Sequence, residues 1–341
     1  MNIKIFLGFT MLCSILACHK DKPIPCVNND PDCYSFEQSD SPMTPFYSRD
    51  GKQYMAPFFN PNNSDEFVYH FRDNDLKVFQ LVKYNLQTME KTILQEGDKI
   101  AKQPKWSRKG WIAYTRLKGY VEHIIVVKDN GDSLRQFSSD LANLDPEWDL
   151  DSENLYWTHS PFLGEIYYLF KKSIFGGETD TILKNDESFF GFTDYKSISN
   201  NNLLVSKTIF NNGNNLAILN LSASQFSFSE LMDLNNPDFA GITGTSWSTN
   251  NSDIYMSFYV KGLYKMNSSS GTKKLLIPFC HSKRYETIST SADGKYLIGE
   301  RIDSRQKLDG QKKTTGEIVE KSSIYLIDLQ TLEETKIDLT P

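Results

Sequence analysis

Short apolar or alternating segments, separated by turn residues, recur along most of the chain. Five of them are four or five residues long and contain aromatic or β-branched residues: residues 124–127, 165–169, 216–219, 262–266 and 323–327. Segments of this kind, bounded by turns, are typical of β-strands. Turns such as Asp129-Asn130-Gly131-Asp132 supply the positive φ that a two-residue hairpin needs. The pattern predicts an all-β protein built from consecutive hairpins.

The hairpins repeat at a nearly constant interval. Each unit has an aromatic residue or its equivalent before a polar turn, and these marks are Phe59, Trp106, Trp148, Tyr195, Trp247 and Thr290. They are 47, 42, 47, 52 and 43 residues apart, a period near 46. Four short strands in each of six units predict a six-bladed β-propeller of four-stranded antiparallel blades.

The repeats also carry a family resemblance. Residues 104–138 show the shared pattern most clearly, with Pro104-Lys105-Trp106-Ser107-Arg108-Lys109-Gly110 before a strand. Residues 146–157 and 245–277 show it next most clearly. This pattern resembles the TolB-type, WD-like propeller repeat, in which Pro-x-Trp-Ser-Pro-Asp-Gly precedes a strand. The resemblance implies a TolB-like propeller over residues 46–341 and a tendency to bind envelope partners. We expect each Trp to pack its blade against the neighbouring blade.

Residues 34–56 resemble the turn motif at Tyr47–Tyr54 but leave no room for a blade. We expect this segment to pair with the last blade and close the ring, which would protect a sheet edge.

Composition and charge narrow the function classes. The 341 residues allow two domains or one large ring, and the 44 aromatic residues (13%) favour β-structure. The net charge is 37 − 43 = −6. Nucleic-acid binding is not expected, because phosphate recognition needs clustered Lys and Arg.

The N-terminus reads as a secretory leader. Residues 1–17 combine Lys4 with an apolar stretch that is too short to span a bilayer. Ile15-Leu16-Ala17-Cys18 resembles a bacterial lipobox, which implies lipid attachment at Cys18; cleavage by the ordinary signal peptidase would instead leave an unmodified thiol. Lipidation would place the protein at the cell envelope, on an outer membrane, through two or more acyl chains.

Residues 18–45 form the predicted tether. Its Lys20-Asp21 is similar to the export signal of Bacteroidetes surface lipoproteins, although a solvated linker explains it as well. Cys26 and Cys33 are expected to form a disulfide in an oxidising envelope, the competing interpretation being a metal site. Cys280 is expected to be a buried thiol.

Catalytic signatures are absent from the sequence. Gly244-Thr245-Ser246-Trp247-Ser248 begins like a nucleophile elbow but lacks the closing glycine. No catalytic residue, cofactor or metal is therefore expected. The enzymatic alternative is a metal-dependent polysaccharide lyase, for which His70 and His159 are the candidate ligands because both come late in the second strands of their blades.

The remaining function is binding. We expect the loops between second and third strands and between blades to share one face, with Lys105 and Glu147 as candidate ligand-binding residues beside Ser160–Gly164. The insertion 303–321 is either a functional loop or a solvated flap. The leading hypothesis is a lipid-anchored, non-catalytic propeller that binds an unidentified envelope protein or other envelope component. Carbohydrate binding without turnover is a further alternative.

Overall fold

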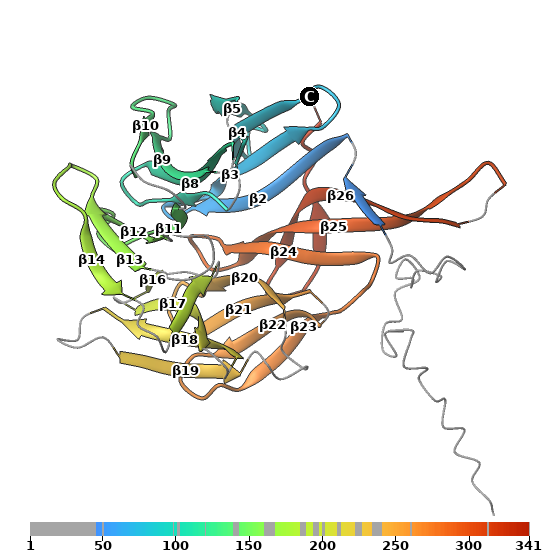
Figure 1. The fold of residues 1–341 in the computed structure, drawn as a ribbon. Helices are drawn as coiled ribbons and strands as arrows, with labels where there is room; N and C mark the ends of the chain where they lie inside the picture. The colour runs from blue at the N-terminus through green and yellow to red at the C-terminus, as the bar shows by residue number, and fades with distance from the viewer. Residues whose placement is uncertain are drawn as a thin grey trace, which may run out of the picture.

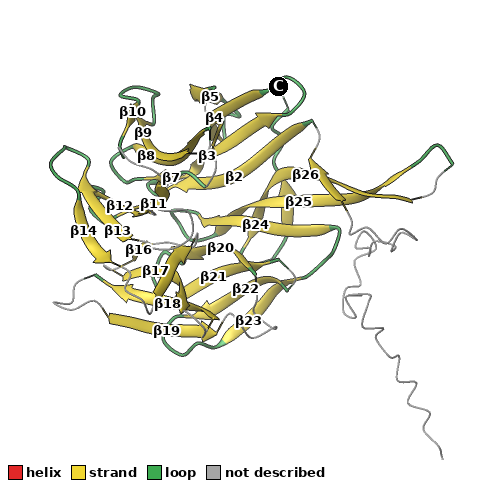
Figure 2. Ribbon diagram, viewed as in Figure 1, coloured by secondary structure: helices red, strands yellow, loops and turns green. Residues whose placement is uncertain are grey.

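Every regular element that the structure describes is a β-strand (Figure 2). The computed structural model describes residues 46–49, 51–97, 99–100, 103–119, 121–138, 143–159, 168–184, 189–193, 198–199, 202–209, 213–221, 227–233, 241–259, 261–311 and 314–340. No helix in this part of the chain is long and apolar enough to cross a membrane. The predicted all-β class is confirmed.

The strands form six sheets in chain order (Figure 1). Blade one contains β2 (Lys52–Asn60), β3 (Asn63–Asp73), β4 (Val78–Asn85) and β5 (Lys91–Glu96). Blade two contains β6 (Lys99–Ile100) and β7 (Lys105–Trp106), followed by β8 (Trp111–Lys118), β9 (Val121–Lys128) and β10 (Arg135–Gln136). Blade three contains β11 (Asn143–Trp148), β12 (Asn154–His159), β13 (Tyr168–Ser173) and β14 (Asp180–Lys184).

The other three blades follow the same plan. Blade four contains β15 (Phe189–Thr193) and β16 (Ile198–Ser199), then β17 (Asn202–Ile209), β18 (Gly213–Asn220) and β19 (Ser227–Asp233). Blade five contains β20 (Ile242–Trp247), β21 (Asp253–Phe258), β22 (Gly262–Asn267) and β23 (Lys273–Pro278). Blade six contains β24 (Lys283–Thr290), β25 (Tyr296–Leu308), β26 (Thr314–Asp328) and β27 (Glu334–Lys336). Within each blade the strands are antiparallel, which confirms the predicted six-bladed propeller.

Apolar side chains fill every junction between neighbouring blades. Six buried clusters occur, and each draws its residues from two adjacent blades. The cluster that closes the ring packs Phe59 and Phe67 of blade one against Ile298 and Ile324 of blade six. Because the apolar contacts continue from blade six to blade one, the six sheets form a closed ring.

The marked aromatic residues that the structure describes, Phe59, Trp106, Trp148 and Trp247, lie in these junctions. Trp106 is 3% exposed between blades one and two, and Trp148 is 5% exposed between blades two and three. The Trp148 indole N–H also donates a hydrogen bond to the Lys105 carbonyl oxygen at 2.9 Å. The predicted packing role of these Trp residues is confirmed, and the loss of such a ring costs about 3–5 kcal/mol in a core.

The expected ring latch is confirmed in part. β1 (Phe46–Arg49) pairs in parallel with Glu317–Glu320 of β26 in the last blade. Residues 52–55 of this region pair with β3 and begin β2, so the segment supplies part of one strand to blade one and does not form a blade of its own. Residues 34–45 lie outside the described part of the chain.

The insertion at 303–321 belongs to a β-hairpin. β25 and β26 remain paired far beyond their partners in the sheet, out to Leu308 and Thr314. The hairpin projects from the ring, with β1 along the base of one edge (Figure 1). Paired backbone therefore replaces the irregular loop or flap that the length of the insertion suggested.

Cys280 is buried and disulfide-bonded, so the expectation of a free thiol at this position is wrong. The other four cysteines, Cys13, Cys18, Cys26 and Cys33, all lie outside the described residues. The predicted Cys26–Cys33 pair and the lipid on Cys18 therefore stay predictions.

Gly244 is explained by the contact between blades five and six. A Cβ atom at this position would lie 2.5 Å from the Glu286 carbonyl oxygen and 3.0 Å from the Thr287 Cα. Both neighbours are backbone atoms of an innermost strand and have little freedom to move. The glycine of the elbow-like sequence thus permits a close approach between blades.

We predict that Gly244→Ala lowers the free energy of unfolding by about 1–3 kcal/mol, since overpacking forces the backbone to shift. Chemical denaturation measures the change. Gly310→Ala is the matched control, because a Cβ there meets nothing within 4 Å. Equal stability of the two variants would contradict the proposed blade contact.

Candidate functional site

A cavity of about 440 Å³ lies where the innermost strands meet. It is lined from the innermost strands of five blades, β2, β6 and β7 with Gln103 between them, β11, β20 and β24, and from the second strands β3 and β25. Arg49 of β1 completes the lining. Its size is within the roughly 300–1,000 Å³ range of small-molecule sites.

The lining residues of the first strands sit at β-bulges. The pairing register shifts between Met55 and Phe58, between Leu144 and Glu147, and between Tyr285 and Ile288. A bulge leaves a residue unpaired and redirects its side chain, which is why bulges are frequent at binding sites. These shifts turn the innermost strands toward the cavity.

Proline produces two of the bulges. Ala56 and Asp145 line the cavity with φ of 50° and 54°, and each precedes a proline. Proline cannot donate to the ladder, so the pairing breaks at Pro57 and Pro146. Positive φ in a residue with a Cβ costs about 1–3 kcal/mol and is concentrated at functional sites.

The cavity lies toward one end of the ring. On the first strands its residues precede the tight turn to the second strand, and on β3 His70 and Arg72 lie near the strand end. These positions are on the side of the second-to-third-strand loops and the connections between blades. The projecting hairpin and β1 belong to the same end, which is therefore called the hairpin end below.

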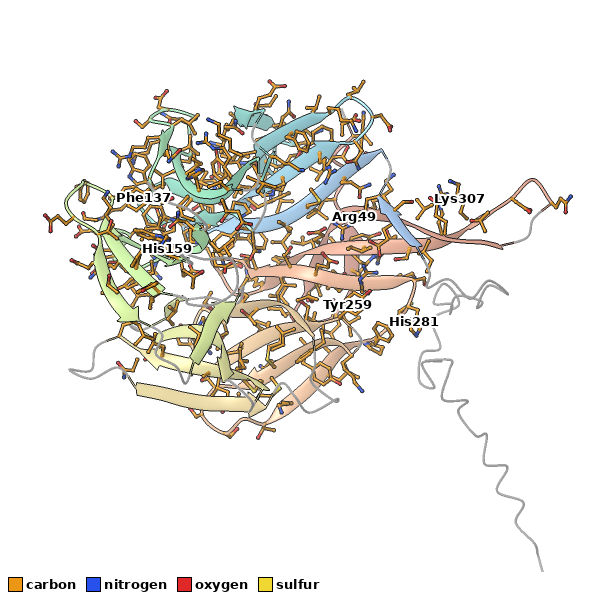
Figure 3. All side chains as sticks on the ribbon, viewed as in Figure 1. Arg49, Phe137, His159, Tyr259, His281 and Lys307 are labelled. Carbon is orange, nitrogen blue, oxygen red and sulfur yellow. The ribbon has the colours of Figure 1, made fainter. Side chains whose placement is uncertain are left out.

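An ionic network joins β1 to blade six at the cavity wall. The Arg49 guanidinium lies 3.3 Å from carboxylate oxygens of both Glu286 and Glu320. Arg284 lies 2.6 Å from Glu320 and 3.5 Å from Glu286. Arg49 occupies the space between blade one and the base of the hairpin (Figure 3). The two arginines thus compensate the two carboxylates.

Glu300 is a buried acid at the junction of blades six and one. It is 3% exposed, and its Oε2 accepts a hydrogen bond from the Ala56 amide at 2.9 Å. Burial and the nearby Glu286 carboxylate raise the pKa of Glu300 to about 7, against the opposing effects of Arg49 and the amide.

The two candidate metal ligands have different surroundings. His70 is 4% exposed and lines the cavity, and burial lowers its pKa to about 3, so its imidazole is neutral. The His159 Nδ1 lies 3.1 Å from the Asn143 Oδ1, and its ring stacks on Phe170. The described cavity lining includes His70 but not His159. Within the described residues, no group of three or more His, Cys, Asp or Glu could hold a metal ion.

Lys105 and Glu147 are paired with each other between blades two and three. Their charged atoms lie 3.1 Å apart and both side chains are buried. The Lys105 ammonium also lies 5.0 Å from the Phe58 ring centroid, and Lys105 lines the cavity. Their predicted role in ligand binding stays a prediction, and the structure adds a role in joining two blades.

Several buried polar atoms of the lining have no hydrogen-bond partner in the described structure. These atoms, all on residues of the cavity wall, are His70 Nε2, Arg72 Nε, Thr245 Oγ1, Thr287 Oγ1 and Glu300 Oε1. A buried polar group costs about 1–3 kcal/mol unless it is hydrogen-bonded. These atoms mark the cavity wall as a surface suited to a polar ligand.

Of these five residues, the sequence analysis named only His70 as a candidate site residue. It missed the other four. A usable signal was present, because the residue three positions before each marked aromatic or equivalent lines the cavity in five blades: Ala56, Gln103, Asp145, Gly244 and Thr287. The repeat that predicts the blades thus also points to the axis-facing positions. Arg72 and Glu300 lie on second strands and carry no such mark.

Comparisons with known proteins show the fold. No family model and no curated protein matches the chain. The propeller domain of the trilobed protease from Pyrococcus furiosus is 13% identical over 85% of this chain and 100% of that one, with a TM-score of 0.52. An oligogalacturonate lyase from Vibrio parahaemolyticus is 12% identical over 84% and 78%, with a TM-score of 0.50.

TolB from Acinetobacter baumannii is 14% identical over 77% of this chain, with a TM-score of 0.49, and the matched region spans 65% of TolB. At these identities the likeness concerns the propeller fold alone, which binding proteins, lyases and peptidases share.

We predict that Lys105→Ala destabilises the protein by about 3–5 kcal/mol, because it leaves the Glu147 carboxylate buried without its cation. The double variant Lys105→Met/Glu147→Met should recover most of this loss. Lys109→Ala is the control, since its pair with Glu153 is exposed and contributes less than about 1 kcal/mol. Urea denaturation at one pH measures all three; equal losses for Lys105→Ala and Lys109→Ala would contradict the buried pair.

We predict that Glu300 makes folding stability fall as the pH rises from about 4.5 to 7. The folded pKa of Glu300, about 7, lies above its unfolded value, so the folded state holds the extra proton in that window. Glu300→Gln should therefore gain stability over the natural protein at pH 8 and show little difference at pH 5. Thermal melts across this range test the prediction, with Glu153→Gln as a surface control. A constant difference at all pH values would contradict it.

Proposed function

We propose that this chain is a non-catalytic binding protein of the cell envelope, anchored by lipid at Cys18, that holds an envelope protein or other ligand at the hairpin end of its propeller. The observation that carries the proposal is the group of buried polar atoms around the cavity that have no hydrogen-bond partner among the described residues. Such atoms stabilise a complex when a bound molecule supplies their missing hydrogen bonds.

The position of the tether supports the choice of face. β1 is the first described strand, and it pairs with β26 at the base of the projecting hairpin. A tether that ends just before Phe46 would join the propeller at the hairpin end. A partner that binds at the cavity mouth and the projecting hairpin would be held on the same side as the anchor.

Affinity capture from envelope membranes tests the proposal. Thr245→Arg places a long side chain in the cavity. Proteins or glycans that the natural chain enriches at least fivefold should be lost from the material captured by this variant. Arg108→Glu, in an exposed turn at the other end of the ring, should leave capture unchanged. Melting curves confirm that each variant is folded. The same enrichment with both variants would contradict the proposed face.

Two further outcomes bear on the anchor and on catalysis. Metabolic labelling with an alkyne fatty acid should mark the natural chain and not Cys18→Ser, and labelling of neither would overturn the lipid anchor. Release of unsaturated products from oligogalacturonate, lost on His70→Ala, would overturn the non-catalytic role in favour of a lyase.

A further inference from the structure

Arg72 differs from the other cations of the cavity wall. Arg49 has carboxylates of Glu286 and Glu320 within 3.3 Å, and Lys105 has Glu147 at 3.1 Å. Arg72 has no ion pair with any residue that the structure describes, and its buried Nε has no hydrogen-bond partner there. Its guanidinium carbon lies 5.5 Å from the Phe79 ring centroid. The cavity therefore presents one arginine whose charge is not compensated by an ion pair.

The surroundings of Arg72 are suited to hydroxyl groups. Thr245 and Thr287 offer side-chain oxygens that both donate and accept, and the neutral His70 imidazole offers one more polar atom. Glu300, from blade six, offers Oε1. A hydroxyl suits each of these groups because it acts as donor or acceptor and carries no charge into a buried site.

The size and composition of the wall favour a compact ligand. The cavity measures about 440 Å³, and no Phe, Tyr or Trp ring contributes to its described lining. Stacking of an extended chain on aromatic faces is therefore not part of this wall. The small adjoining pocket between blades one and two, of about 40 Å³, shares Arg72 and His70 and gives the anionic end of a ligand additional room.

We propose that the cavity binds a small hydroxyl-bearing anion, a carboxylate or a phosphate monoester of a sugar, with its anionic group on Arg72 and its hydroxyls on Thr245, Thr287 and Glu300. The inference rests on the proposed binding function and names the chemistry of its ligand. Arginine suits both anionic groups because its planar fork matches carboxylate and phosphate oxygens.

Isothermal titration calorimetry of the folded protein with D-glucuronate, D-glucose 6-phosphate and D-glucose tests the inference and separates the two anionic classes. At least one anion should bind, and neutral D-glucose should bind at least tenfold more weakly. Arg72→Gln should lower the affinity for that anion tenfold or more, and Arg72→Lys should retain part of it. Arg108→Gln is the control and should change nothing. Equal binding of D-glucose, or no loss with Arg72→Gln, would overturn the proposal.

A second pair of variants tests the hydroxyl contacts. Thr245→Val and Thr287→Val should each weaken binding of the sugar anion about three- to tenfold while leaving binding of acetate or inorganic phosphate unchanged. An equal loss of affinity for the sugar anion and for acetate or inorganic phosphate would mean that the variants act through the fold. That result would contradict recognition of the hydroxyl groups.

The two proposals fail in different ways. If none of the three compounds binds and capture still depends on Thr245→Arg, the ligand chemistry is wrong and the binding face stands. If an anion binds but capture is insensitive to Thr245→Arg, the ligand chemistry stands and the proposed use of this face for envelope partners is wrong.

Discussion

Packing between neighbouring blades is the interaction on which the rest of this structure depends. Each blade buries apolar side chains against the blades on both sides of it, and the six junction clusters follow one another around the ring. The closing junction sets Phe59 against Ile298, two residues far apart in the sequence. A closed ring leaves the innermost strands facing one axis, so the polar groups they carry are concentrated there.

The central cavity follows from how those innermost strands accommodate the ring. Bulges at Ala56 and Asp145 redirect side chains toward the axis, and a proline after each residue prevents regular pairing. Glu300 reaches across from blade six to accept the Ala56 amide, so one hydrogen bond both joins the closing blades and shapes the cavity wall. Stability of the closure and polarity of the site are coupled through this residue.

Charges near the axis fall into two groups. Lys105 and Glu147, and Arg49 with Glu286, are paired across strands and contribute to assembly of the ring. Arg72 and Glu300 each retain a buried polar atom that no residue in the described part of the chain hydrogen-bonds, and such an atom is costly unless a ligand satisfies it. Sequence alone named Lys105 and Glu147 as candidate ligand-binding residues on one face because each precedes a Trp, but flanking position does not reveal that the two side chains face each other.

The strands, the turns and the number of blades could be predicted from the sequence, because they depend on short-range patterns: apolar spacing, turn residues and the recurrence of residues such as Trp106, Trp148 and Trp247. Tertiary structure decided which polar side chains meet. Arg49 and Glu286 are 237 positions apart, and their contact depends on the pairing of β1 with β26 of the last blade. The site therefore depends on registers between distant strands, which local patterns do not encode.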